Sequence, residues 1–325
     1  MRPVQLVTLV LSAFLAGCAS GARATPEAPR AAPSTTGEAA APASVVAVPA
    51  PSGEVGFLVM AHGGDEAWNA SVEAEVAEVR GVLPVELAFG MANPGTLRAA
   101  LNELDGQGVE RVAVVRMFLS GSSFREQTDW FLGMSDVAPE RFVLMGPAAE
   151  DPQARLQVEH DLEVATHDHG LLDSDVARDI LRERAASLSE RPAEESVLLI
   201  AHGMGDEAEN QAVLDDLERI ASTIRLDGYA RVRSETLRED WPEERAVAEE
   251  RIRSFVEAEV GAGRRVLVVP ARLSGFGPYA DVLQGLPYAH SEGFLPHPSL
   301  SDWILRTGAE LACTRGWVDA EDCES

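Results

Sequence analysis

Residues 56–63 read GFLVMAHG, and residues 197–203 read VLLIAHG. Each stretch is an apolar run that ends in Ala-His-Gly and leads into a segment with helical periodicity. His62 and His202 therefore stand at the same place, directly after a predicted buried strand. A repeated strand-and-helix unit predicts two similar α/β domains. Any ligand site is then expected at the loops that follow the strands.

The composition narrows the classes of partner. The chain has 325 residues, which is enough for about two domains. Its apolar content of 46% suits packed cores, and its net charge is −26 with Arg supplying all 27 basic residues. An acidic surface argues against nucleic acid and against anionic lipid as partners. It favours solubility, and it is also compatible with attraction of metal cations.

The N-terminus is predicted to be an export signal rather than part of the fold. Arg2 precedes a short apolar run, and Leu-Ala-Gly-Cys follows at residues 15–18. The run is too short to span a bilayer and resembles a bacterial lipoprotein signal over residues 1–18, with Cys18 as the lipidated first residue. The alternative is an ordinary signal peptide with a chance Cys. Ala19 is compatible with sorting to the outer membrane, on the periplasmic side of the cell envelope.

Residues 19–52 are rich in Ala, Pro, Ser and Thr and show no apolar periodicity. We expect a disordered tether, so that the membrane is contacted through the lipid alone. At the other end, Cys313 and Cys323 are the remaining cysteines. In an exported protein they are expected to form a disulfide that pins the tail at 311–325, with free thiols or a metal role as the alternatives.

The two halves alternate predicted strands and helices. In the first domain, residues 53–150, strands are predicted at 56–61, 85–89, 109–119 and 141–145. A linker at 151–172 leads to the second domain, residues 173–310, with strands at 196–201, 230–237 and 265–270. Leu273-Ser274-Gly275 repeats Leu119-Ser120-Gly121. This order predicts tandem α/β domains, each a parallel sheet with helices on both faces.

Four segments carry a resemblance to a known family. They are AHG at 61–63 and 201–203, GVERVAVVRMFLSG at 108–121, and GFLPHPSLSDWI at 293–304. Over residues 54–305 the chain resembles the sirohydrochlorin cobalt/iron chelatases, the CbiX/SirB branch of the class II chelatases. The resemblance implies two α/β domains that face each other across a cleft. It also implies a lyase that inserts a divalent metal into a tetrapyrrole such as sirohydrochlorin without ATP.

His62 and His202 are the residues that this resemblance assigns to catalysis and metal binding. A neutral imidazole binds Co²⁺ or Fe²⁺, with Zn²⁺ as a further possibility, and it can also accept a pyrrole proton. The alternative is a ring that hydrogen bonds a loop carbonyl. We expect His62 to contribute more than His202, because Gly63 and Gly64 let a ligand approach while Met204 is bulkier.

The chain departs from the family in the loops after its Leu-Ser strands. Family members carry a second His there, whereas residues 118–124 and 273–279 contain none. A site with one His per domain needs both domains, or oxygen ligands from nearby carboxylates. The candidates are Asp65, Glu66, Asp206 and Glu207, for which helix N-terminal caps and partners of the helix dipole are the favoured alternative.

Other residues are weaker candidates. Arg116 and Arg272 stand shortly before the two Leu-Ser-Gly loops, in places that we take as matching, and Arg125 follows the first loop. These three are expected to bind the carboxylates of a tetrapyrrole, or else to form surface ion pairs. The set also includes a metal role for the segment with His160, His167 and His169. Stacking on a macrocycle is the role considered for Trp130, Trp241 and Trp303, and a structural role is expected for His297.

Three functions remain open on the sequence. The first is a lipid-anchored protein that binds a divalent metal and inserts it into a tetrapyrrole. The second is a non-catalytic carrier of metal or tetrapyrrole, and the third is an interaction lipoprotein with a vestigial cleft. An insertion assay separates the first from the second, and metal analysis separates the third from both.

Overall fold

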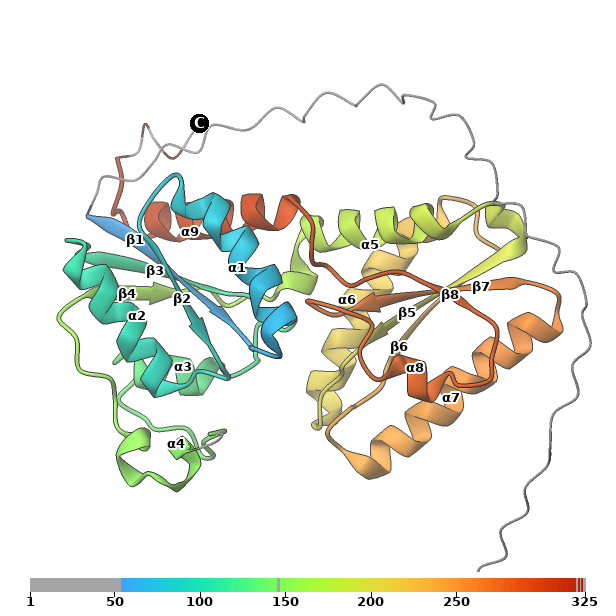
Figure 1. Cartoon of the computed structure of the whole chain (residues 1–325), viewed down its shortest axis with the longest axis horizontal. Coiled ribbons are helices and arrows are strands. Elements are labelled where there is room, and N and C mark those ends of the chain that lie inside the picture. The colour runs from blue at the N-terminus through green and yellow to red at the C-terminus, as the bar shows by residue number, and fades with distance from the viewer. Residues whose placement is uncertain (1–53, 145–146, 320, 322, 324–325) are drawn as a thin grey trace, which may run out of the picture. The chain divides into compact units, whose positions relative to one another are not determined.

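The computed structural model describes residues 54–144, 147–319, 321 and 323 (Figure 1). The expected signal at 1–18, with Cys18, and the tether at 19–52 lie outside these residues.

The first sheet is parallel, with the strand order β2-β1-β3-β4. Its strands are β1 (Val55–Ala61), β2 (Val85–Phe89), β3 (Arg111–Arg116) and β4 (Glu163–Thr166). All of β1 is buried, as expected for a central strand covered on both faces.

The second sheet repeats this arrangement. It is parallel with the order β6-β5-β7-β8. Its strands are β5 (Glu195–Ala201), β6 (Arg231–Thr236), β7 (Arg265–Ala271) and β8 (Ala289–His290). The predicted fold, two chelatase-like units each built on a parallel sheet, is confirmed.

One strand was predicted in the wrong place. Residues 141–144 form no strand, and β4 lies instead inside the expected linker at 151–172. The backbone of Val143 is satisfied by the side chain of Gln127, which accepts from its N–H at 2.7 Å and donates to its carbonyl at 3.1 Å. Phe142 and Leu144 pack against the core, so their apolar pattern reflects packing rather than pairing in a sheet.

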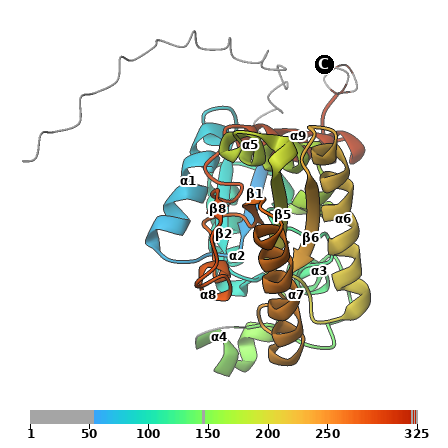
Figure 2. The same ribbon diagram turned by 90° about the vertical axis from the view of Figure 1, so that its right-hand side faces the viewer.

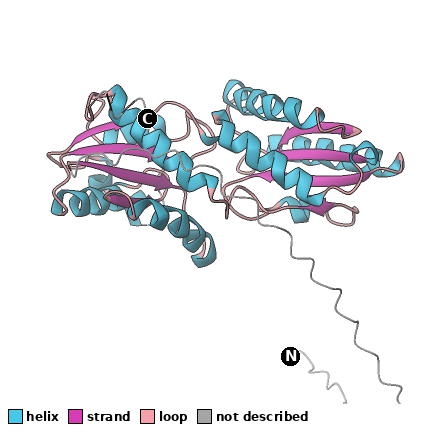
Figure 3. Cartoon of the chain, turned by 90° about the horizontal axis from the view of Figure 1, so that it is seen from above, coloured by secondary structure: helices cyan, strands magenta, loops and turns pink. Residues whose placement is uncertain are grey.

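Helices cover the faces of both sheets (Figure 3). The α-helices are α1 (Glu66–Arg80), α2 (Pro94–Gly106), α3 (Arg125–Phe131), α4 (Pro147–Glu150), α5 (Asp175–Leu188), α6 (Glu207–Arg225), α7 (Pro242–Gly261), α8 (Tyr279–Val282) and α9 (Ser299–Thr314). Short 3₁₀ turns are η1 (Pro152–Arg155), η2 (Leu171–Asp173) and η3 (Pro192–Glu194).

The last helix returns to the first sheet. α9 packs on α1, β1 and β3, whereas α5 packs on β7 of the second sheet, and the two helices also touch each other (Figure 2). The segment expected to complete the second domain up to residue 310 therefore supplies a layer of the first sheet. The two halves are joined by two chain crossings, which follow β4 and β8.

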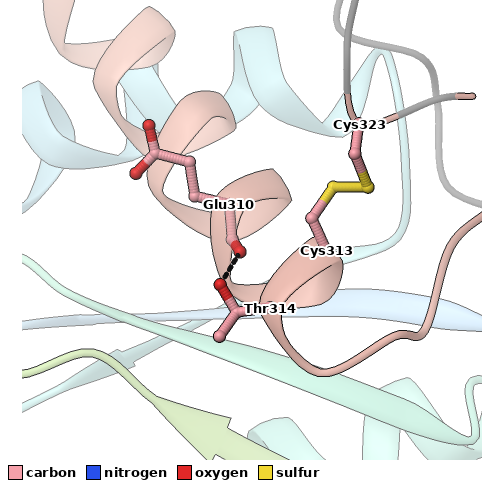
Figure 4. The surroundings of a disulfide bond; sticks show 4 residues. All are labelled: Glu310, Cys313, Thr314 and Cys323. Carbon is pink, nitrogen blue, oxygen red and sulfur yellow. Dashed lines mark hydrogen bonds between the residues drawn. A yellow bond between two sulfur atoms is a disulfide. The ribbon is translucent and has the colours of Figure 1, made fainter. Parts of the chain in front are cut away.

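The C-terminal tail is attached to α9 by a disulfide. Cys313, in the last turn of α9, is bonded to Cys323 (Figure 4). Among the described helices, none is both long and apolar enough to cross a membrane.

Candidate functional site

The two repeated histidines occupy equivalent positions at the carboxyl edges of the sheets. β1 ends at Ala61 and β5 at Ala201, so His62 and His202 each begin the next loop. In both rings Nδ1 lies close to the carbonyl oxygen of the following glycine, at 2.9 Å for His62 and 2.8 Å for His202. An Nδ1–H that donates to this carbonyl leaves the lone pair on Nε2, the nitrogen available to a metal or a proton.

The glycine after each histidine is required by the backbone. Gly63 and Gly203 have φ values of +83° and +84°, which other residues rarely adopt. A Cβ on Gly203 would also lie 2.8 Å from the Cβ of Thr236. The His-Gly repeat is thus partly a demand of the fold.

The surroundings of the two histidines differ. Nε2 of His202 lies 3.3 Å from a carboxylate oxygen of Asp240, and the Trp241 ring stands perpendicular to the imidazole with centroids 6.0 Å apart. His62 is more exposed, and nothing in the described parts of the chain hydrogen bonds or pairs with its Nε2. The structure gives the carboxylate partner to the second half, although the sequence favoured the first. No hydrogen bond or ion pair joins the two histidines among the described residues.

Strained backbone gathers at the same edges. The described non-glycine residues with positive φ are Ala92 (52°), Phe124 (53°) and Arg238 (56°). They lie in the loops after β2, β3 and β6. Such conformations cost of the order of 1–3 kcal/mol each and concentrate at functional sites.

Two of the four candidate carboxylates, Asp65 and Asp206, are the N-cap residues of α1 and α6. Asp65 accepts a hydrogen bond from the Trp68 N–H at 2.9 Å, and Asp206 caps α6 in the same way. Glu207 pairs with Arg238. Among the described residues no three His, Cys, Asp or Glu side chains are grouped closely enough to hold a metal. A metal at His202 and Asp240 would thus take its further ligands from water or from a substrate.

The role predicted for Arg116 in substrate binding is not supported by its surroundings. Its side chain is 1% exposed and donates to the carbonyls of Gly121 (3.0 Å), His167 (3.3 Å) and Ser123. Burial, with a contribution from nearby Arg125, lowers the pKa of Arg116 to about 10. Arg116 therefore shapes the loop at 120–123 from beneath.

The expected match between Arg116 and Arg272 is also wrong. Arg116 pairs with Met60 of β1, and the residue that pairs with the equivalent Ile200 of β5 is Pro270. Arg272 follows its strand and pairs with Glu239. The two arginines stand at different distances from their Leu-Ser-Gly loops. The sheet register shows that they are not at equivalent positions.

Arg125 and the histidines after β4 are engaged in local structure. Nε of Arg125 lies 2.8 Å from an Asp129 carboxylate oxygen. Nε2 of His167 accepts from the Arg116 N–H at 2.9 Å, and its Nδ1 lies 2.9 Å from the His169 carbonyl. Burial lowers the pKa of His167 to about 3, with help from His169 and Arg116. A neutral ring with both nitrogens occupied has no lone pair left for a metal.

The remaining candidates are structural, with one exception. His160 lies 3.2 Å from the Leu132 carbonyl, and His297 lies 3.2 Å from Glu183. Trp303 is buried, and the indole N–H of Trp130 donates to the Arg155 carbonyl. Trp241 is the exception, because it stands beside His202.

Two residues of this site were missed by sequence reasoning. Asp240 and Arg238 follow β6, far along the chain from His202. Only the pairing of β6 with β5 brings their loop beside the histidine. The signal available in the sequence was an acidic residue, Asp240, shortly after the strand predicted at 230–237.

Comparison with known proteins supports the fold through structure alone. No family model matches the sequence, and no curated protein matches it. SirB from Bacillus subtilis with Fe³⁺ superposes with a TM-score of 0.59 at 16% identity, over 82% of this chain and 99% of that one. The sirohydrochlorin chelatase SirB from Bacillus subtilis subspecies spizizenii in complex with cobalt gives 0.51 at 15% identity, over 79% and 96%.

A third similar structure is a multi-domain protein from Deinococcus radiodurans that is described as similar to chelatases. It gives a TM-score of 0.51 at 19% identity, over 79% of this chain and 55% of that one. These likenesses show the fold of this chain: two parallel α/β units arranged as in the SirB structures.

Proposed function

We propose that this protein binds a divalent metal ion at the carboxyl edge of its second sheet and inserts it into a tetrapyrrole. The observation that carries the proposal is the contact between His202 and Asp240, 3.3 Å apart at the place where a parallel sheet presents its ligands. The chelatase-like fold supports the reaction class.

The metal in this reaction is a substrate that must be released. One imidazole nitrogen and one carboxylate suit Co²⁺ or Fe²⁺, and also Zn²⁺, with water completing the coordination. Two protein ligands hold an ion less tightly than a closed structural site does. The Asp240 side chain is exposed, which suits an ion that enters from solvent and leaves toward a macrocycle.

Insertion also releases two protons from the pyrrole nitrogens. Nε2 of His202, once it has released the metal to the macrocycle, is the base that we assign to one of them, and the Asp240 carboxylate stabilises the imidazolium that results. His62, exposed at the other sheet, is the corresponding base for the second.

A carrier that binds metal without inserting it is the second candidate. It is favoured by the lack of a histidine in the loops at 118–124 and 273–279, where the resemblance to the chelatases leads us to expect a second one. The test is anaerobic incubation of the purified chain with Co²⁺ and sirohydrochlorin, followed by absorbance. The proposal predicts insertion above the uncatalysed rate, which Asp240→Asn reduces about 10-fold or more. Binding of Co²⁺ without faster insertion would identify a carrier.

We also propose that the mature chain is attached to the bacterial envelope, at the periplasmic side of the outer membrane, by a lipid on Cys18. The support is the Leu-Ala-Gly-Cys sequence after an apolar run. Mass spectrometry of membrane-extracted protein should find a lipidated Cys18 at the N-terminus, and Cys18→Ser should abolish it. Mature protein that still begins before Cys18 would contradict this.

A further inference from the structure

One arginine connects the two loops that carry the His202 and Asp240 side chains. Arg238 donates from Nε to the Met204 carbonyl at 2.9 Å and from a terminal nitrogen to the Gly205 carbonyl at 2.5 Å. Its other terminal nitrogen contacts a Glu207 carboxylate oxygen at 2.6 Å. Its backbone N–H donates to the His202 carbonyl at 2.7 Å. All four acceptors belong to the segment that begins at His202.

The backbone of Arg238 is held in an unfavourable conformation. Its φ is +56°, a value that side chains with a Cβ rarely adopt, and the residue is 8% exposed. A buried, strained arginine persists only when its surroundings offset the cost. The four hydrogen bonds are that compensation.

The contacts of Arg238 also restrain Asp240, because only one residue separates the two in the chain. Asp240 is two residues beyond Arg238, and the next residue, Trp241, packs over Gly205 so closely that a side chain at 205 would collide with the indole. Arg238 on one side and Trp241 on the other thus hold the Asp240 segment against the His202 loop.

The first half provides the internal contrast. Phe89 pairs with Ala61 and Thr236 with Ala201, so the second residue after each strand is Met91 in the first half and Arg238 in the second. A methionine side chain has no donor for the loop after β1. In the described chain Nε2 of His62 has no carboxylate partner, whereas that of His202 has Asp240.

We propose that Arg238 is a positioning residue that sets the separation of His202 and Asp240 and thereby the affinity of their metal site. Its consequence for metal binding rests on the proposed function. Its role in holding the loops does not depend on any metal, so the two parts can fail separately.

The decisive variant is Arg238→Gly. Glycine accepts the positive φ without strain, so the fold is retained while the three side-chain contacts are lost. We expect Co²⁺ affinity, measured by calorimetric titration, to fall about 10- to 100-fold, as is typical when a residue that orients a ligand is removed. Arg253→Gln is the matched control, because that guanidinium also donates to backbone carbonyls, those of Val282 and Gln284, at a different place in the second half. It should leave the affinity unchanged.

Hydrogen exchange without metal tests the positioning itself. The amide N–H groups of Arg238 and Glu239 both face the His202 carbonyl and should exchange faster in Arg238→Gly. Metal affinity should also be non-additive: once Asp240→Asn is present, Arg238→Gly should cost little more. Unchanged exchange in Arg238→Gly, or full additivity, would overturn the positioning role. Wild-type protein that binds no Co²⁺ would overturn the proposed function, and exchange alone would then decide whether Arg238 holds the loops.

Discussion

The two halves differ at one equivalent corner of the fold, where the start of the central strand meets the end of a helix. Near the start of β1, Gly56 packs against Leu104 and Val109, whereas near the start of β5 the hydroxyl of Ser196 donates to the Glu259 carboxylate at 2.6 Å. The backbone N–H of Val109 bonds the Leu104 carbonyl at 3.1 Å, and that of Arg264 bonds the Glu259 carbonyl at 3.0 Å. The matching hydrogen bonds show that the corners are equivalent. One backbone thus accepts either an apolar corner or an ionic network.

The carboxyl edges differ in a similar way. In the first half the titratable groups behind the edge, Arg116 and His167, are buried and bonded to backbone. In the second half His202 and Asp240 are accessible. Behind the first edge these two polar groups are therefore bound up in the fold, whereas in the second half His202 and Asp240 can be reached from solvent.

The largest predicted difference between the halves is that acid destabilises the first half more than the second. The folded-state pKa of His167 is about 3 and its ordinary value is 6.5, so the unfolded chain takes up the proton first as the pH falls. Stability from this group is complete above pH 6.5 and is lost progressively down to about pH 3, for a total of about 5 kcal/mol. Hydrogen exchange at pH 7 and pH 5 should show protection lost in β3 and β4 before β5 and β7. The reverse order would contradict the prediction.

The second-largest predicted effect on stability concerns Glu259 at the corner of the second half. Burial alone would raise the pKa of Glu259, but hydrogen bonds from Arg264, Ser196 and Arg231 outweigh it and lower the pKa from 4.5 to about 2. The stability from this carboxylate is present above pH 4.5 and is lost between pH 4.5 and 2.

Glu259→Gln should therefore cost about 3 kcal/mol at pH 7 in urea unfolding, and much less near pH 2. Glu257→Gln, which alters an exposed pair with Arg253 on the same helix, is the control and should cost under about 0.5 kcal/mol. An equal effect of the two substitutions would mean that the corner network contributes nothing special.

Exchanging the corner residues should give the smallest effect. A Cβ at position 56 would lie 2.9 Å from a methyl of Val109 and 3.1 Å from a methyl of Leu104, so Gly56→Ser forces a shift of a stiff branched side chain. We expect a loss of roughly 1–3 kcal/mol, measured by thermal unfolding. Ser196→Gly removes one hydrogen bond to Glu259 and should cost about 1 kcal/mol. A neutral Gly56→Ser would show that the first corner is looser than its packing suggests.

The sequence predicted what local pattern controls and missed what the sheet brings together. Continuous apolar runs located β1, β3, β5 and β7, and the repeated His-Gly located the two carboxyl edges. The run at 141–145 was misassigned because apolar residues pack the core equally well outside a strand, with the Gln127 side chain satisfying the backbone. β4 was missed because it is short and half-buried.

The same distinction explains which residues of the candidate site were predicted from the sequence and which were missed. His62 and His202 were found because they follow strands directly. Asp240 and Arg238 were missed because nothing local connects them to His202, and Arg116 was misread because its burial follows from packing that the sequence does not display. The preference for His62 rested on the small residues around it. It did not include the partner that the neighbouring strand supplies to His202.

The central claim is that the second half holds the metal site, and one titration tests it most directly. Co²⁺ is titrated into wild type, His202→Ala, Asp240→Asn and His62→Ala at pH 7. The account predicts about 10-fold or greater loss of affinity in His202→Ala and in Asp240→Asn, with His62→Ala close to wild type. Loss in His62→Ala with His202→Ala and Asp240→Asn unaffected would contradict it.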